Sequence, residues 1–332
     1  MPNPKETRIG VVVHTERAAT LFTTATRAQL NALGDVRWTD KAKPLTVDEA
    51  CALLADCDVG VGSWGTPVPS AELMAACPRL RLWEHAAVSV KHVFGPHLAG
   101  RNLVVGSCAP ALADNVAESV LAEIILGLRR FVPNAAANRT AQAPAPAQLK
   151  EVCEATVGIV GASMVGRRVI ALLAPFRPRV LVYDPLLTPG DAAKLGVVHE
   201  PDLVALCAAS DVVSLHAPAI PATTGMIGAR HLQAMRDDAV FINSARGACV
   251  DEAALCAELA KGRLFAFIDV TEPEPAALDS PLRTLPNVFL TSHITGAGYF
   301  KVGRQAVADI AAFLKGGMPL RPVTADMLAG IA

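Results

Sequence analysis

Short apolar runs alternate with longer amphipathic stretches along most of the chain. In the first 110 residues, strand-like runs occupy residues 8–14, 36–39, 59–64, 80–85 and 103–107. Helical patterns at residues 17–33, 47–55 and 70–76 lie between several of them. Apolar strands that alternate with helices are typical of a parallel sheet covered on both faces. This part of the chain therefore predicts an α/β domain.

A second series of the same kind begins after residue 150. Residues 112–130 first show a long helical pattern, and residues 134–148, rich in Ala and Pro, indicate a surface arm outside the core. We then expect strands at residues 156–160, 180–183, 212–216, 240–243, 264–269 and 288–291, followed by a helix at residues 301–314. The sequence thus predicts a second parallel sheet.

Composition limits the classes of function. The 332 residues are 52% hydrophobic, which suits about two domains with sizeable cores. A net charge of −1 argues against general attraction to nucleic acid or membrane surfaces, and no apolar run reaches the roughly 18–20 residues of a membrane span. The N-terminus lacks the layout of a signal peptide, and the eight cysteines form no CxxC pair. We expect a cytoplasmic protein with reduced thiols and no metal.

A glycine loop follows the strand predicted at residues 156–160. The segment VGIVGASMVG at residues 157–166 places Gly161, Ser163 and Gly166 in the spacing of the G-x-G-x-x-G pattern. Small residues at these positions let the backbone approach a pyrophosphate at a helix N-terminus. Ser163 replaces the middle glycine, and it can cap the helix or donate to a phosphate, although it could also alter the loop.

An acidic residue accompanies this loop. Asp184 ends the next strand, 23 residues after Gly161, close to the expected spacing of about 20 for the acid that binds the ribose hydroxyls. A carboxylate at this point repels a 2′-phosphate. We therefore expect NAD as cofactor in preference to NADP.

Chemically active side chains follow three later strands. Arg246 comes after the strand at residues 240–243, carboxylates lie in IDVTEPEP at residues 268–275, and His293 follows residues 288–291. Open α/β sheets bind ligands at the carboxyl ends of their strands. Arginine can bind a carboxylate or polarise a carbonyl, and histidine can protonate a developing alkoxide. A carboxylate behind the histidine would favour the imidazolium and orient the ring, so this set suits the reduction of a 2-oxo acid.

These motifs, together with VLVYDP, SLHAP, FINSARGACVDEAAL and PLRTLPNVFLTSHITG, are similar to those of the D-isomer-specific 2-hydroxyacid dehydrogenase family. The resemblance covers essentially the whole chain and is strongest from residue 150 to 300. It implies two Rossmann-like, doubly wound parallel-sheet domains with the active site in the cleft between them. Residues 1–110 with 298–332 would form the substrate domain, and residues 111–297 the NAD-binding domain.

The resemblance also implies roles for individual residues. Arg246 would bind substrate, His293 would be the acid/base, and Glu274, rather than Glu272, would be its partner. Substrate contacts are also implied for Ala87 and Val88. The expected cofactor-binding set is Gly161, Ser163, Met164, Val165, Gly166, Asp184, His216, Ala217, Pro218, Ser244, Ala245, Asp269 and Gly296.

Two further positions depart from the family pattern. Ser292 stands where proline usually precedes the histidine, which could loosen the loop. Val88 stands where a glycine is expected in the loop whose N–H groups hold the substrate carboxylate. A β-branched residue disfavours positive φ and crowds a ligand. The identity of the acid is therefore left open.

The favoured function is hydride transfer between NAD(H) and C2 of a small D-2-hydroxy or 2-oxo acid. Formate dehydrogenases pair the histidine with glutamine, so Glu274 argues against them, whereas a phosphite-type dehydrogenase and an NAD-sensing, corepressor-like binding protein stay open. A regulated phosphoglycerate enzyme is less expected because the chain ends soon after the last helix. The apolar helix at residues 112–130 and the arm after it favour a homodimer.

Overall fold

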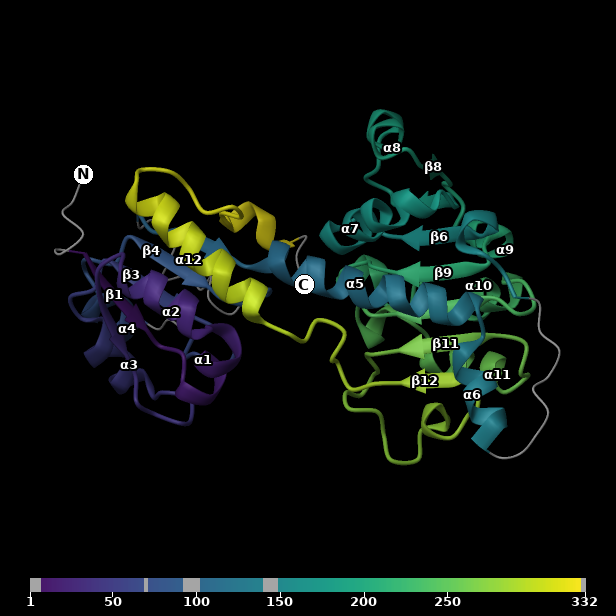
Figure 1. Cartoon of the computed structure of the whole chain (residues 1–332), viewed down its shortest axis with the longest axis horizontal. Helices are drawn as coiled ribbons and strands as arrows, with labels where there is room; N and C mark the ends of the chain where they lie inside the picture. The colour runs from purple at the N-terminus through teal and green to yellow at the C-terminus, as the bar shows by residue number, and fades with distance from the viewer. Residues whose placement is uncertain (1–6, 69–70, 92–101, 140–148, 330–332) are drawn as a thin grey trace. The chain divides into compact units, whose positions relative to one another are not determined.

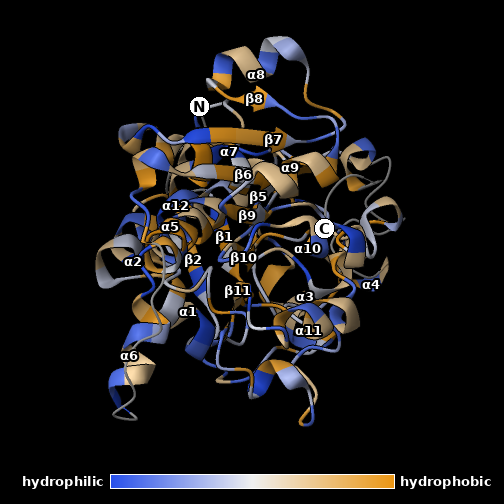
Figure 2. Cartoon of the chain, turned by 90° about the vertical axis from the view of Figure 1, so that its right-hand side faces the viewer, coloured by the Kyte–Doolittle hydropathy of each residue, from blue (hydrophilic) through white to orange (hydrophobic). Residues whose placement is uncertain are grey.

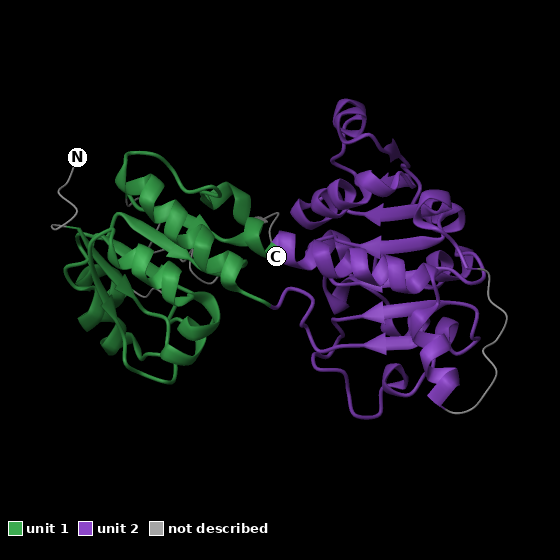
Figure 3. Cartoon of the chain, viewed as in Figure 1, with its two compact units in different colours: residues 1–112, 298–332 green, residues 113–297 purple. Residues whose placement is uncertain are grey.

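The computed structural model describes residues 7–68, 71–91, 102–139 and 149–329. The chain divides into two compact units, residues 1–112 with 298–332 (unit 1) and residues 113–297 (unit 2) (Figure 3). Each unit is built around its own parallel sheet (Figure 1). No helix in the described part of the chain has both the length and the apolar character that crossing a membrane requires.

Unit 1 contains a five-stranded sheet with the order β2-β1-β3-β4-β5. Its strands are β1 (Arg8–Val11), β2 (Asp35–Trp38), β3 (Val59–Gly62), β4 (Leu82–His85) and β5 (Val104–Ser107). Helices α1 (Thr15–Leu21), α2 (Thr24–Asn31) and α12 (Phe300–Leu314) share an apolar core with the strands. Helices α3 (Val47–Leu54) and α4 (Ala71–Ala76) contribute to a second core cluster. The sheet is therefore doubly wound.

Unit 2 contains a seven-stranded sheet with the order β12-β11-β10-β9-β6-β7-β8. Its strands are β6 (Thr156–Val160), β7 (Arg179–Tyr183), β8 (Val198–His199), β9 (Val212–Leu215), β10 (Val240–Asn243), β11 (Phe265–Ile268) and β12 (Val288–Leu290). All paired strands run parallel. Strands β6 and β7 are largely hydrophobic (Figure 2), as expected for strands covered on both faces.

The helices of unit 2 enclose this sheet in two core clusters. One contains residues of α5 (Ala109–Leu128) and α7 (Met164–Leu173). The other contains residues of α9 (Leu203–Ala209), α10 (Ala229–Ala234) and α11 (Glu252–Leu259). Helices α6 (Phe131–Arg139) and α8 (Pro189–Leu195) complete the α-helices of the unit's described part.

Two predicted elements differ from the structure, and one strand was not predicted. The helix expected at residues 17–33 is two helices, because Thr23 is extended and its side chain caps α2 by accepting from Thr26 N. The two-residue strand β8 was not predicted, since so short a run carries no periodicity. The arm expected at residues 134–148 is helical as far as Arg139, where alanines favour α6, and residues 140–148 lie outside the described residues.

Candidate functional site

The predicted site residues of unit 2 follow its strands at one edge of the sheet. Because all the strands are parallel, their carboxyl ends lie along this same edge. The edge is where open α/β sheets bind ligands. In sheet order, the residues are His293 after β12, Glu274 after β11, Arg246 after β10, His216 after β9, Gly161 after β6 and Asp184 after β7.

The glycine loop has no room for side chains at two positions. Gly161 has a φ of 99°, and a Cβ there would lie 2.9 Å from the backbone N of Ala217. A Cβ on Gly166 would lie 2.1 Å from the carbonyl oxygen of Gly161. The loop backbone therefore lies directly against both the SLHAP segment and the first turn of α7, with no side chain at Gly161 or Gly166 to cover it. This cradle fits a dinucleotide pyrophosphate.

Ser163 caps the helix that follows the loop, as one reading of the sequence predicted. Its φ is −64°, which any residue can adopt, so the position does not require glycine. Its hydroxyl accepts from the N–H of Gly166 at 3.3 Å. Met164 and Val165 open the helix at the same place, half-buried.

Asp184 is held against the glycine loop. Its Oδ2 accepts from the N–H of Ala162 at 2.7 Å, and its Oδ1 accepts from the N–H of Leu186 at 2.8 Å. The loop also donates from Gly161 N to the carbonyl of Tyr183. Hydrogen bonds therefore join Asp184 to the glycine loop at the ends of β6 and β7, although Ala162 and Asp184 are 22 residues apart. This joined region is called the glycine corner.

His216 is buried and neutral. Its Nε2 lies 2.9 Å from the hydroxyl of Ser214, and burial lowers the pKa of the ring to about 3. Its Nδ1 is buried and, within the described residues, has no hydrogen-bond partner. Ala217 is buried beside Gly161, and Pro218 is half-buried. A buried ring nitrogen without a partner next to the glycine loop is a further feature that fits a polar ligand.

Hydrogen bonds within the loop that carries Arg246 hold its conformation. Asn243, the last residue of β10, accepts from Ala245 N at 3.1 Å and donates to the carbonyl of Arg246 at 3.1 Å. A Cβ on Gly247 would lie 2.2 Å from the carbonyl of Thr271, so the loop packs closely on the segment after β11. The Arg246 side chain is half-buried and makes no ion pair with any described carboxylate.

Asp269 organises the loop that carries the histidine. Its carboxylate accepts from Thr291 Oγ1 at 2.6 Å, Ile294 N at 2.8 Å and Thr295 N at 2.9 Å. Burial acts to raise the pKa of Asp269, but the hydrogen bonds from Thr291 and Thr295 outweigh it and lower the pKa. These bonds come from residues on both sides of Ser292 and hold the loop to Asp269.

The side chains of His293 and Glu274 are hydrogen-bonded to each other. Nδ1 of His293 donates to Oε1 of Glu274 at 2.5 Å, and both side chains are partly exposed. His293 has a φ of 56°, a conformation that costs energy for a residue other than glycine and is found at functional sites. Because Nδ1 is engaged, Nε2 is the ring atom left for a reacting group. Glu272 is exposed and does not contact the ring in the structure.

The predicted substrate loop lies in unit 1, after β4. Ala87 is buried and its N–H donates to the carbonyl of His85 at 2.7 Å. The N–H groups of Val88 and Ser89 donate to no acceptor among the described residues, and Val88 does not have a positive φ. The backbone strain expected from valine is therefore absent, and two amides are available in this loop.

Helix α5 supplies residues that sequence reasoning missed. Asn115 donates to the carbonyl of Gly296 at 3.4 Å and Ser119 to that of Thr295 at 2.9 Å, so the helix supports the histidine loop. Glu123 is largely buried and accepts weakly from Ser244 Oγ at 3.5 Å. Burial, aided by the charge of Asp269, raises its pKa to about 8. The sequence signal that could have identified Glu123 is a carboxyl side chain inside an apolar helical run.

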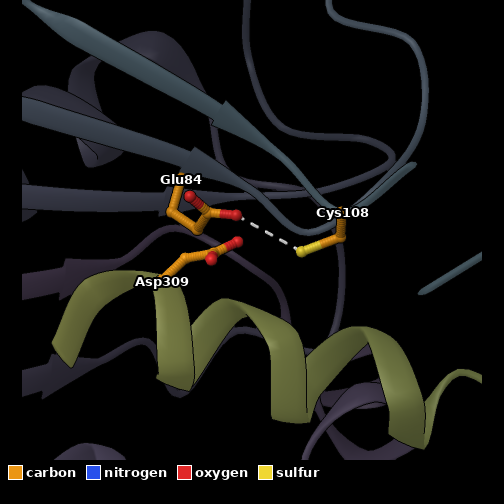
Figure 4. Close-up of side chains that lie close together, drawn as sticks. All are labelled: Glu84, Cys108 and Asp309. Atoms are coloured by element: carbon orange, nitrogen blue, oxygen red, sulfur yellow. Dashed lines mark hydrogen bonds between the residues drawn. The ribbon is translucent and has the colours of Figure 1, made fainter. Parts of the chain in front are cut away.

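Unit 1 contains a separate buried polar cluster of Glu84, Cys108 and Asp309 (Figure 4). Cys108 Sγ donates to Glu84 Oε1 at 3.3 Å, and Asp309 accepts from Gln305 and from the N–H of Leu320. Burial, with the charge of Asp309, raises the pKa of Glu84 well above its ordinary value. The cluster is therefore consistent with a protonated, neutral Glu84 beside the Cys108 thiol in the core of unit 1.

The fold and the glycine corner define an α/β protein with a dinucleotide-binding unit. Residues 121–295 match the model of the D-isomer-specific 2-hydroxyacid dehydrogenase NAD-binding domain. The chain is 30% identical over 300 residues to a glyoxylate reductase of Korarchaeum cryptofilum, covering 88% of this chain and 90% of that protein. The chain belongs to the D-isomer-specific 2-hydroxyacid dehydrogenase family.

Other relatives agree with this placement. A D-3-phosphoglycerate dehydrogenase of Mycobacterium bovis is 32% identical over 286 residues, covering 84% of this chain and 53% of that protein. The chain thus spans about half the length of such relatives. The NAD-complexed D-isomer-specific 2-hydroxyacid dehydrogenase of Lactobacillus delbrueckii ssp. bulgaricus has the same fold, with a TM-score of 0.78 at 21% identity over 96% of this chain and all of the other.

Proposed function

We propose that the protein is an NAD-dependent oxidoreductase that moves a hydride between nicotinamide C4 and C2 of a small D-2-hydroxy or 2-oxo acid. The observation that carries this proposal is the His293–Glu274 pair. Its two residues follow β12 and β11, and β11 pairs with β10, the strand before Arg246. An acid/base and a carboxylate-binding cation at neighbouring strand ends meet the two requirements of 2-oxo acid reduction.

Each residue then has a defined task. Bound NADH supplies the hydride. Arg246 binds the C1 carboxylate of the oxo acid and draws electron density from the C2 carbonyl. His293 gives the proton on Nε2 to the carbonyl oxygen as that oxygen becomes a hydroxyl, while Glu274 holds Nδ1 and compensates the imidazolium charge. Oxidation of the hydroxy acid reverses these steps and begins with neutral His293.

The glycine corner would hold the cofactor. The backbone around Gly161, Ser163 and Gly166 would contact the pyrophosphate, and Asp184 the ribose hydroxyls. We propose NAD in preference to NADP because a 2′-phosphate would meet the negative charge of Asp184. Ser244, Ala245, Asp269 and Gly296, on the loops after β10, β11 and β12, would contact the nicotinamide end of the cofactor.

The proposal is tested by following NADH oxidation with glyoxylate, hydroxypyruvate, pyruvate and bulkier 2-oxo acids. At least one should turn over, with NADH favoured over NADPH. NADH binding without turnover of any acid would support a corepressor-like binding protein instead. Reduction of NAD by phosphite would support the phosphite-type alternative.

We further propose a cytoplasmic homodimer formed through unit 2. Phe131 and Phe289 of this unit are 59% and 46% exposed, which is more apolar surface than the unit needs alone. The described chain has free thiols at all eight cysteines, as suits a reducing compartment. Sedimentation at tens of micromolar should give the mass of two chains, and a monomer there would contradict the dimer.

A further inference from the structure

Unit 1 places a cation and two aromatic rings near the carboxyl edge of its own sheet. Arg17 lies in the first turn of α1, which follows β1. Trp64 comes two residues after β3, and Tyr299 immediately precedes α12. Each of the three side chains is half-buried. This edge, like that of unit 2, is where an open parallel sheet presents a ligand site.

The two rings hold the guanidinium. Arg17 Cζ lies 5.2 Å from the ring centroid of Trp64 and 5.4 Å from that of Tyr299. The two ring centroids are 5.1 Å apart with an interplanar angle of 49°. Cation–π attraction of this kind restrains the flat face of an arginine and leaves its N–H edge able to donate. Arg17 is therefore oriented in advance.

No carboxylate in the described part of the chain neutralises the charge of Arg17. Within the described residues, its guanidinium makes no ion pair and donates no hydrogen bond. Other arginines of unit 1 do have carboxylate partners, among them Arg37 with Asp56 and Arg79 with Asp58. A half-buried, oriented and uncompensated cation favours an anionic ligand.

The same region carries the predicted substrate loop. Val88 packs against the apolar core cluster that Trp64 and Tyr299 also contact. Ser107 Oγ donates to the carbonyl of Val88 at 3.0 Å, which fixes the loop beside β5. Ser63 Oγ donates to the carbonyl of Ala86 at 2.9 Å, which ties the segment before Trp64 to this loop. Trp64, Tyr299 and the Val88 loop thus pack against one apolar core cluster of unit 1, and Arg17 contacts the two rings.

We propose that Arg17, held by Trp64 and Tyr299, binds a second anionic group of the substrate, so that the favoured 2-oxo acids carry a distal carboxylate or phosphate. The inference rests on the proposed function, in which Arg246 takes the C1 carboxylate. Trp64 and Tyr299 are positioning residues for the guanidinium.

The test compares substrates of equal chain length in pairs. Oxaloacetate is set against 2-oxobutyrate, 2-oxoglutarate against 2-oxovalerate, and phosphohydroxypyruvate against hydroxypyruvate. The wild-type protein should favour the anionic member of at least one pair in kcat/KM, and the best pair identifies carboxylate or phosphate. Arg17→Met should lower kcat/KM for that anionic member by about 10- to 100-fold, the size of a lost charge-assisted hydrogen bond, and should change the uncharged member less than threefold.

Two further variants distinguish the effect of the Arg17 charge from a structural effect of the substitution. Arg17→Lys keeps the charge without the planar fork and should retain an intermediate preference. Arg27→Met is the matched control, because Arg27 also stacks on a ring, 3.9 Å from the centroid of Trp38, and should leave the preference unchanged.

Calorimetry with the NADH complex keeps the inference testable if turnover fails. The anionic member of the pair should bind more tightly to the wild-type protein, and this advantage should disappear in Arg17→Met. Equal binding of both members, or equal losses for both on substitution of Arg17, would overturn the inference while leaving turnover of simple 2-oxo acids, and so the proposed function, intact. Absence of any turnover beside a clear Arg17-dependent binding preference would overturn the proposed function alone.

Discussion

The partner of His293 is the residue on which the proposed chemistry depends most. Oε1 of Glu274 accepts from Nδ1 at 2.5 Å, and this contact orients the ring and leaves Nε2 for the substrate. The structure also holds His293 at a φ of 56°, a strained conformation that the Asp269 hydrogen bonds to its loop maintain. Glu274 and Asp269 therefore both fix the position of the His293 imidazole ring.

Glu274→Gln should lower kcat for reduction, because an amide replaces the carboxylate that accepts from Nδ1 of His293 and orients the ring. The measurement is the steady-state rate of NADH oxidation with the best 2-oxo acid. Glu272→Gln, two residues earlier and exposed, is the control and should leave kcat unchanged. His293→Ala should lower kcat by roughly 10²–10⁴; near-normal turnover would contradict the assigned role.

Asp184→Ala should narrow the preference for NADH over NADPH by about tenfold, because it removes the charge that a 2′-phosphate would meet. Absolute affinity for both cofactors should also fall, since Asp184 accepts from Ala162 N and Leu186 N. The ratio of the two dissociation constants, measured by fluorescence titration, isolates the charge effect. Equal affinities in the unmodified protein would count against the assignment.

At the scale of elements, the tight packing of the glycine loop against α7 leads to a clear expectation. Gly166→Ala places a Cβ 2.1 Å from the carbonyl of Gly161, so the loop must shift. Affinity for NADH should fall by at least tenfold, and the free energy of unfolding by about 1–3 kcal/mol. Gly190→Ala in α8 is the control, since its Cβ would have 3.8 Å to the nearest atom. Unchanged NADH binding by Gly166→Ala would contradict the role of the loop.

Most strands could be predicted because buried parallel strands are short, apolar and followed by polar residues. β6 and β10 match the predicted ranges, 156–160 and 240–243. The break at Thr23 was missed because helical periodicity continues on both sides of it. Side-chain contacts with distant partners, such as Asn115 with Gly296 and Asn243 within the Arg246 loop, depend on tertiary structure, and a single sequence carries no local signal for them.

At the scale of the whole molecule, the buried Glu84 links stability to pH. Its pKa is raised in the folded state above the ordinary 4.5, mainly by burial and also by Asp309. Above pH 4.5 the unfolded chain loses this proton while the folded chain keeps it, so stability falls as pH rises, by up to about 1.4 kcal/mol per pH unit.

Glu84→Gln removes this dependence. Relative to the wild-type protein, the variant should gain stability steadily as the pH rises above 4.5, as measured by chemical denaturation at each pH. Asp58→Asn is a contrasting control, because Asp58 pairs with Arg79 and its loss should destabilise the protein. Parallel stability curves for the wild-type and Glu84→Gln proteins would show that Glu84 is ionised in the fold.

The central claim, hydride transfer to C2 of a 2-oxo acid, is tested most directly by deuterium labelling of the hydride donor. The best 2-oxo acid from the panel is reduced with NADH deuterated at nicotinamide C4, on each face in turn, and the product is analysed by NMR and chiral chromatography. Deuterium should appear at C2 from one face only, and the product should be the D-2-hydroxy acid. Product without deuterium from either face, or the L enantiomer, would contradict the account.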